Sequence, residues 1–127
     1  MRLADTGIWI DHFRQADPRL IQTIENDMLL CHPAIVGELA LGSLRDRTNT
    51  LGFLAVQQEV IVATHHEVMA MIDKHQLYGM GIGYTDAHLL ASTLIDSRAA
   101  LWTRDKRLRK AAEKAGARVV SDGTRPN

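Results

Sequence analysis

The chain has 127 residues, 46% hydrophobic and 24% charged, which predicts one globular domain over residues 1–127; its longest apolar runs are far too short to cross a membrane. Fifteen basic residues balance fifteen acidic ones, so no global positive field indicates nucleic-acid binding, which would have to depend on a local patch. The single cysteine, Cys31, excludes an internal disulfide, and the N-terminal segment lacks a signal-peptide pattern, so we expect a cytoplasmic protein.

The first part of the chain alternates strand and helix signals. The short apolar segment before Asp5 turns directly into a helical pattern over residues 7–14, which is typical of the first βα unit of a parallel sheet. Asp17-Pro18 predicts the start of a second helix, because Asp is a good N-cap and Pro suits the first helical position. The apolar run 28–31 predicts a strand buried on both faces.

The same alternation continues to the end of the chain. We expect a helix from His32-Pro33, a turn over 45–50, a weaker helix over 51–58 and a strand over 60–63. Thr64 is expected to cap the next helix, and the glycine-rich segment 79–83 to break the chain. A helix over 85–95, a strand over 99–102, a basic helix ending near Gly116, a strand over 117–120 and a frayed polar tail from residue 121 complete an α/β chain.

Four acidic residues occur at corresponding places in these units: Asp5, Glu38, Asp86 and Asp105. The carboxyl ends of parallel strands and the N-termini of the following helices share one edge of a sheet, where ligands bind, so all four can meet there. Each also has a purely structural interpretation. Asp5 and Asp105 can cap helices, Asp86 can complement a helix dipole and Glu38 can be solvated, although Glu38 lies in a largely apolar segment.

Four carboxylates in one pocket would repel one another strongly, and burial would drive some of them to bind protons. A divalent cation removes this conflict. Ligands that are all oxygen atoms favour hard ions, so the pattern indicates Mg²⁺ or Mn²⁺ rather than zinc.

The arrangement of these motifs resembles the PIN-domain nucleases, and most closely the VapC-type toxins of bacterial VapBC toxin–antitoxin pairs. The resemblance depends on Asp-Thr-Gly near the N-terminus, Glu38 in GELALG, Asp86 in YTDAHLLA and Thr103-Arg104-Asp105 after a strand, and it covers nearly the whole chain. It implies a three-layer α/β/α fold with a parallel sheet of four or five strands. Gly7 departs from the pattern, since members often carry Ser there.

The resemblance implies hydrolysis of RNA phosphodiesters by water that Mg²⁺, or alternatively Mn²⁺, activates. Asp5, Glu38, Asp86 and Asp105 match the catalytic acids, and three of them, Asp5, Asp86 and Asp105, would be metal ligands. Thr6 and Thr103 match supporting hydroxyl groups of the family. The resemblance also implies a cognate antitoxin and a homodimer.

Two further features add to this interpretation. Arg104 lies beside the last acid and could hold a substrate phosphate, whereas the other basic residues of 106–110 fit a solvated helix face. Trp9, Phe13, Leu20 and Ile21 carry more apolar surface than one side of a thin sheet is expected to bury, which favours an interface, although Trp9 itself is expected in the core.

Other functions fit less well. A receiver domain needs its Asp after a middle strand, and a phosphatase needs a second Asp where this chain has Gly7. The remaining alternatives are a PIN-like nucleic-acid-binding module without catalysis, and a nuclease that acts on another nucleic-acid substrate outside a toxin–antitoxin pair.

Overall fold

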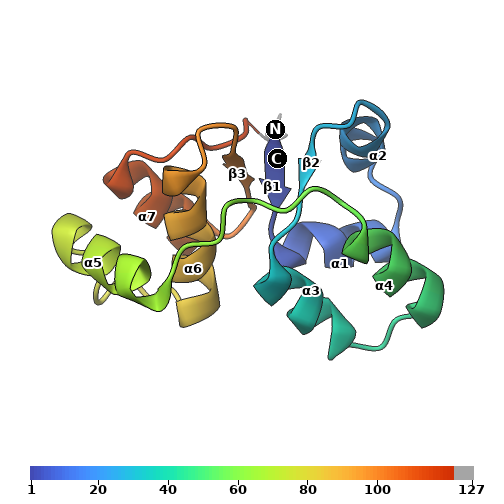
Figure 1. Cartoon of the computed structure of the whole chain (residues 1–127), viewed down its shortest axis with the longest axis horizontal. Helices are drawn as coiled ribbons and strands as arrows, with labels where there is room; N and C mark the ends of the chain where they lie inside the picture. Colours follow the sequence, from blue (N-terminus) through green and yellow to red (C-terminus); the bar gives the residue numbers. More distant parts are fainter. Residues whose placement is uncertain (122–127) are drawn as a thin grey trace.

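The computed structural model describes residues 1–121 and shows an α/β fold built around a short parallel sheet. The sheet order is β2-β1-β3, so the first strand of the chain lies in the centre. Figure 1 shows the strands between α1–α4 on one side and α5–α7 on the other. The elements are β1 (Arg2–Ala4), α1 (Thr6–Arg14), α2 (Pro18–Glu25), β2 (Leu29–Leu30), α3 (Pro33–Ala40), α4 (Arg47–Ala55), α5 (His65–His75), α6 (Tyr84–Ile95), β3 (Ala100–Trp102) and α7 (Lys106–Ala115).

The central strand sets the register of the sheet. Leu3 of β1 pairs with Leu30 of β2 and with Leu101 of β3, and all three side chains are fully buried. Such a strand must be apolar on both faces, because helices cover both sides of the sheet. The three strands are parallel, so their carboxyl ends lie at one edge of the sheet.

The prediction of a strand over 60–63 is wrong, because the structure has only an isolated bridge here, between Cys31 and Glu59 just before the segment. The Val60 N–H still donates to the Cys31 carbonyl over 2.9 Å. The next donors turn away from the sheet: the Ile61 N–H donates to the Asp96 carboxylate, and the Ala63 N–H donates to the Ser92 hydroxyl. Side chains of α6 and its C-cap thus take the place of a strand ladder.

The expected last strand over 117–120 is likewise reduced to one bridge, between Val119 and Leu101. The Leu101 N–H donates to the Arg118 carbonyl, and the Val120 N–H donates to the Leu101 carbonyl. The described residues therefore form three strands with a single bridge at each outer edge, and not the four or five strands that we expected. The expected frayed tail lies outside the described residues from position 122 onwards.

The prediction of a turn over 45–50 is also wrong in its extent. Helix α4 begins at Arg47, and the Thr50 N–H already donates to the Asp46 carbonyl over 2.9 Å. The polar residues that suggested a turn form an exposed first turn of helix instead. The weaker helix predicted over 51–58 ends at Ala55.

Several local predictions are confirmed. Thr64 caps α5 in a reciprocal capping box with Glu67. Gly116 ends α7 in the left-handed conformation, with φ 77°. Gly81 in the break between α5 and α6 has φ 80° and lies against the Arg107 side chain, so a larger residue there would be strained and crowded.

The first two helices bury some of their large apolar side chains and expose others. Trp9 is in the core, as predicted, and Leu20 is fully buried. Ile10, Phe13 and Ile21 are exposed, so apolar surface remains on these helices. Within residues 1–121, no helix combines the length and the apolar character needed to cross a bilayer.

Candidate active site

A cavity of about 250 Å³ lies at the carboxyl edge of the sheet, and all four predicted acids line it. Four segments far apart in the sequence meet there: the end of β1, the second turn of α3, the first turn of α6 and the start of α7. The lining residues are Asp5, Thr6, Gly7, Ile10, Asp11, Glu38, Asp86, Arg104 and Asp105. The strand ends and helix starts thus converge as the topology required.

Asp5 is the buried acid of this site. It follows β1 and caps α1, because its Oδ1 accepts from the Ile8 N–H over 3.1 Å. Burial raises the pKa of Asp5, and the charge of Asp105 adds to this, while hydrogen bonds from Thr103 and from the Ile8 backbone partly offset the increase. Capping and site formation are therefore not alternatives for this residue, since the same carboxylate does both.

Thr103 connects two of the acids from beneath the cavity. Its hydroxyl is completely buried and donates to Oδ2 of Asp5, while its oxygen accepts from the Asp105 N–H over 3.0 Å. The residue itself is absent from the cavity lining. Its position at the end of β3 thus orients acids from both ends of the chain.

The other two acids on helix starts differ in exposure. Asp105 is exposed and caps α7 by accepting from the backbone N–H groups of Arg107 and Leu108, at 2.9 and 3.1 Å. Asp86 is half-buried in the first turn of α6. Burial, followed by the charges of Asp105, Asp5 and Glu38, raises the pKa of Asp86 to about 6. The four carboxylates therefore share one electrostatic field.

Glu38 reaches the site from the exposed side of α3, where its Oε1 accepts from the Thr6 hydroxyl over 2.5 Å. The second predicted supporting hydroxyl thus also contacts an acid directly. Ile35 and Leu39 on the same helix are buried and hold it against the core. The apolar segment around Glu38 is only partly buried, since Leu41 is 90% exposed, and Glu38 itself lies on the exposed side.

Arg104 lines the cavity, but its guanidinium already makes ion pairs with two acids. It contacts Asp11 over 3.0 Å and Asp17 over 2.9 Å. The hydrogen bond from Arg104 contributes to the lowered pKa of Asp17, although burial of that carboxyl opposes it. No sequence pattern singled out Asp11, which lies on α1 six residues after Asp5.

The donor set has the chemistry of a site for a hard divalent cation. Four carboxylates line one cavity, and burial together with the charges of the other three acids raises the pKa of Asp86; a bound cation would oppose this increase. Within residues 1–121, however, no three His, Cys, Asp or Glu side chains are already arranged to hold a metal ion. The chemistry fits, and binding would require carboxylates that line the cavity to come closer together.

Comparison with known proteins decides the family. No protein-family model matches the chain. It is, however, 42% identical over 122 residues to Ribonuclease VapC32 of Mycobacterium tuberculosis, in strain CDC 1551 / Oshkosh and equally in strain ATCC 25618 / H37Rv. The alignment covers 96% of this chain and 98% of the relative. The chain belongs to the VapC family of toxin ribonucleases.

Membership of the VapC family agrees with the order of the four acids along the chain. The family makes this protein a ribonuclease. In this VapC chain the acids come from elements that are separated by up to about a hundred residues and meet only through the parallel sheet. The cavity that the four acids line is therefore the candidate site for phosphodiester hydrolysis.

Proposed function

We propose that this VapC protein is an endoribonuclease toxin that cleaves RNA at the acidic cavity and requires Mg²⁺, with Mn²⁺ as a possible substitute. The observation that carries the proposal is the convergence of Asp5, Glu38, Asp86 and Asp105 on one cavity. Family membership supports the RNA substrate and a divalent cation, and hard oxygen ligands favour Mg²⁺.

Asp5, Asp86 and Asp105 would hold the cation, with Glu38 completing the acidic ring. When bound, a divalent cation lowers the pKa of water and stabilises charge on the phosphate. Asp5 is suited to a fixed ligand because two donors orient its carboxylate. Glu38, on the exposed side, is suited to accept a proton from the attacking water.

The hydroxyl groups of Thr6 and Thr103 act as positioning groups in this scheme. Thr103 orients Asp5 and the backbone of Asp105, and Thr6 holds Glu38 at the mouth of the cavity. Arg104 would contact a substrate phosphate only by loosening its pairs with Asp11 and Asp17. The ion pairs hold its guanidinium beside the cavity until RNA arrives.

A free ribonuclease of this kind harms its own cell, so we also propose a cognate VapB antitoxin and a homodimer. An antitoxin arginine placed among the four acids would replace a cation and pair with carboxylates in a fork geometry. The exposed side chains of Phe13 and Ile21 offer apolar contact surface for such a partner. Light scattering tests the dimer, and a monomer at working concentrations would contradict it.

The deciding experiment measures cleavage of RNA by the purified chain with Mg²⁺, with Mn²⁺ and with excess EDTA. Cleavage should disappear with EDTA and return when the metal is restored. Asp5→Asn should abolish cleavage and keep the fold, because asparagine still offers an oxygen to cap α1. Unchanged cleavage in EDTA, or by the folded Asp5→Asn variant, would overturn the proposal.

An RNA-binding module without catalysis is the second possibility. It would bind RNA but release no cleavage products under any of these conditions. The retention of all four acids on one cavity favours the enzyme over this module.

A further inference from the structure

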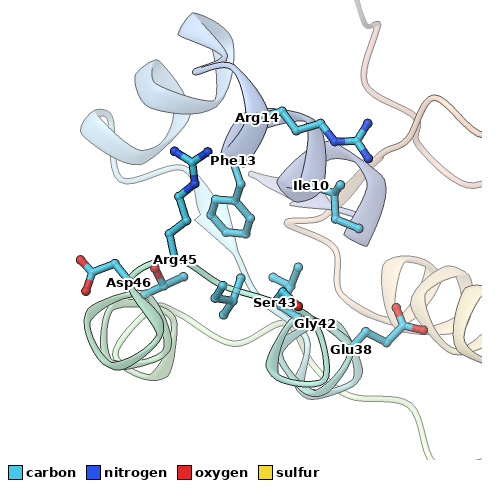
Figure 2. A pocket seen from close by; sticks show the side chains of 11 residues that line it. Ile10, Phe13, Arg14, Glu38, Gly42, Ser43, Arg45 and Asp46 are labelled. Atoms are coloured by element: carbon cyan, nitrogen blue, oxygen red, sulfur yellow. The ribbon is translucent and has the colours of Figure 1, made fainter.

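A second, larger cavity opens beside the acids, between α1, α3 and the segment that joins α3 to α4. Its volume is about 510 Å³, and Ile10 and Glu38 line both cavities. Figure 2 shows Phe13 and Ile10 extending from α1 towards the connecting segment, with Arg45 extending the opposite way. The two cavities adjoin at Ile10 and Glu38. We call the larger cavity the side groove; it is lined by Ile10, Phe13, Arg14, Glu38, Leu39, Gly42, Ser43, Leu44, Arg45, Asp46 and Thr50.

We propose that the side groove binds a base of single-stranded RNA next to the phosphate held at the acids, with Phe13 stacking on that base and Arg45 holding the adjoining backbone. The inference rests on the proposed function, since it takes the acidic cavity as the position of the scissile phosphate. It adds the part of the substrate that lies beside that phosphate and the residues that contact it.

Phe13 supplies the aromatic face. Its side chain is 38% exposed and contacts Trp9, whose ring centroid lies 6.0 Å away and which is itself buried. A ring supported from beneath and open on the groove side is pre-formed for stacking, and aromatic stacking accepts any base. Leu39 and Leu44 continue the apolar lining around it.

Two arginine side chains line the groove. Arg14 lies one residue after Phe13 on α1, and Arg45 approaches from the other wall of the groove. The negative charges on the same lining are Glu38 and Asp46, which appear at opposite ends in Figure 2. Asp46 accepts from the Asn49 side chain over 3.1 Å. In Figure 2 the Arg45 guanidinium lies on the Phe13 side of the groove, whereas the Arg14 side chain extends away from that ring. The part of the groove around Phe13 therefore combines an aromatic ring with one cation, as in sites that bind single strands.

The electrostatics of the acids favour a second contact for RNA. The four carboxylates repel phosphates, and a cation bound among them would offset this repulsion only at the acidic cavity, so contacts outside it add to the affinity. The chain has no net charge that could supply them. Stacking on Phe13 and the positive charge of Arg45 meet this need, which favours RNA as the occupant of the groove.

The test measures the Kd of fluorescein-labelled hexaadenylate by anisotropy, with every protein carrying Asp86→Asn so that the probe is not cut. Phe13→Leu should weaken binding about tenfold, because leucine keeps the apolar volume and loses the stacking face. Phe53→Leu is the matched control, since Phe53 is 37% exposed on α4 and lies outside the groove lining. Phe13→Tyr should restore the affinity of the unaltered groove.

A hexamer of the same backbone without bases separates stacking from charge. Phe13→Leu should leave the Kd of this probe unchanged. Arg45→Gln should weaken the binding of both probes and reduce the slope of log K against log salt concentration by about one. Thermal unfolding of each variant checks that the fold is kept. Equal Kd values for Phe13→Leu and Phe53→Leu would overturn the proposal.

The outcomes also separate this inference from the proposed function. Metal-dependent cleavage by the unaltered enzyme together with unchanged hexaadenylate binding by Phe13→Leu contradicts the groove alone. Binding that depends on Phe13 without cleavage by the unaltered enzyme contradicts the proposed function and keeps the groove. If Phe13→Leu weakens only the complex with the antitoxin, the groove binds a protein segment and the proposal is wrong.

Discussion

The hydroxyl of Thr103 donates a hydrogen bond to the carboxylate of Asp5, which lies 98 residues earlier in the chain. The contact joins the ends of β1 and β3, two neighbouring strands, and the same oxygen accepts from the Asp105 N–H. One buried threonine thus orients the buried acid of the cavity and the backbone of a second acid.

Replacing Thr103 by valine tests this positioning role. Valine keeps the shape and removes both hydrogen bonds, so we expect a loss of about 10–100-fold in cleavage, as for residues that orient metal ligands. The unmatched Asp105 N–H and Asp5 carboxylate should lower the free energy of unfolding by about 1–3 kcal/mol. Cleavage assays and urea unfolding measure the two effects.

The control for this variant is Thr103→Ser, which keeps the hydroxyl and should recover most of the activity. Loss of the bond from Thr103 also raises the pKa of Asp5 further, so the pH profile of Thr103→Val should move to higher pH. A profile at the original pH, with activity reduced only in proportion to the unfolded fraction, would show a purely structural role.

Asp86 should make the metal-free protein less stable as the pH rises. Its folded pKa, about 6, lies above the ordinary value, so its stabilising contribution is present in acid and is lost as the pH rises through about 6. At pH 8 without metal, Asp86→Asn should therefore be more stable than the unaltered protein by about 1 kcal/mol, after allowance for solvent screening at this half-buried site.

Thermal unfolding in EDTA between pH 4 and pH 8 measures this difference, because that range extends about two pH units to either side of the Asp86 pKa. The advantage of Asp86→Asn should shrink as the pH falls and disappear near pH 4. A variant that is less stable at pH 8 would show that Asp86 is a structural residue.

Asp96 should show the opposite dependence on pH. Its buried carboxylate accepts from the Ile61 N–H and pairs with Arg98, and these contacts, led by the Arg98 hydrogen bond, hold its pKa well below the usual range. Its contribution to stability is therefore complete above about pH 4 and is lost as the pH falls further. Asp96→Asn should cost about 1–3 kcal/mol at neutral pH, measured by urea unfolding.

The measurement is repeated at several pH values, and the cost of Asp96→Asn should be constant above about pH 5. Arg98→Gln is the matched variant, because it removes the partner and leaves the carboxylate. If the cost of Asp96→Asn instead fell as the pH rises, the charged carboxylate of Asp96 would not be the form that stabilises the fold.

Binding of the antitoxin should compete with the metal. If an arginine of the partner occupies the acidic cavity, Mg²⁺ and the antitoxin need the same carboxylates, so the Kd of the complex should rise with Mg²⁺ concentration. Calorimetric titration at several Mg²⁺ concentrations and constant ionic strength measures this. An affinity that does not depend on Mg²⁺ would place the inhibitory contact elsewhere.

Much of the fold could be predicted from local patterns. Pro and Asp near residue 17, the capping residue Thr64 and the glycine at 116 act within one turn of the chain, so their effects do not depend on distant partners. The strand over 60–63 could not be excluded in this way. Its N–H groups are taken by Asp96 and Ser92, which lie about thirty residues later.

The sequence by itself determined which acidic residues meet at the candidate site. Asp5, Asp86 and Asp105 stand where a strand ends or a helix begins, and Glu38 stands one turn further into its helix. The parallel order of the units brings these places to one edge of the sheet. Their gathering on one cavity follows from the topology, since that arrangement is the same for any chain of this strand order.

Only the tertiary structure decided how each of these groups is held. Arg104 is paired with Asp11 and Asp17, Asp105 caps α7 while it lines the cavity, and the side groove arises where α1 meets the segment before α4. Such contacts join residues distant in sequence, and their directions depend on how helices pack. No local pattern encodes that packing, because the side chains have no preferred partners until the sheet brings their elements together.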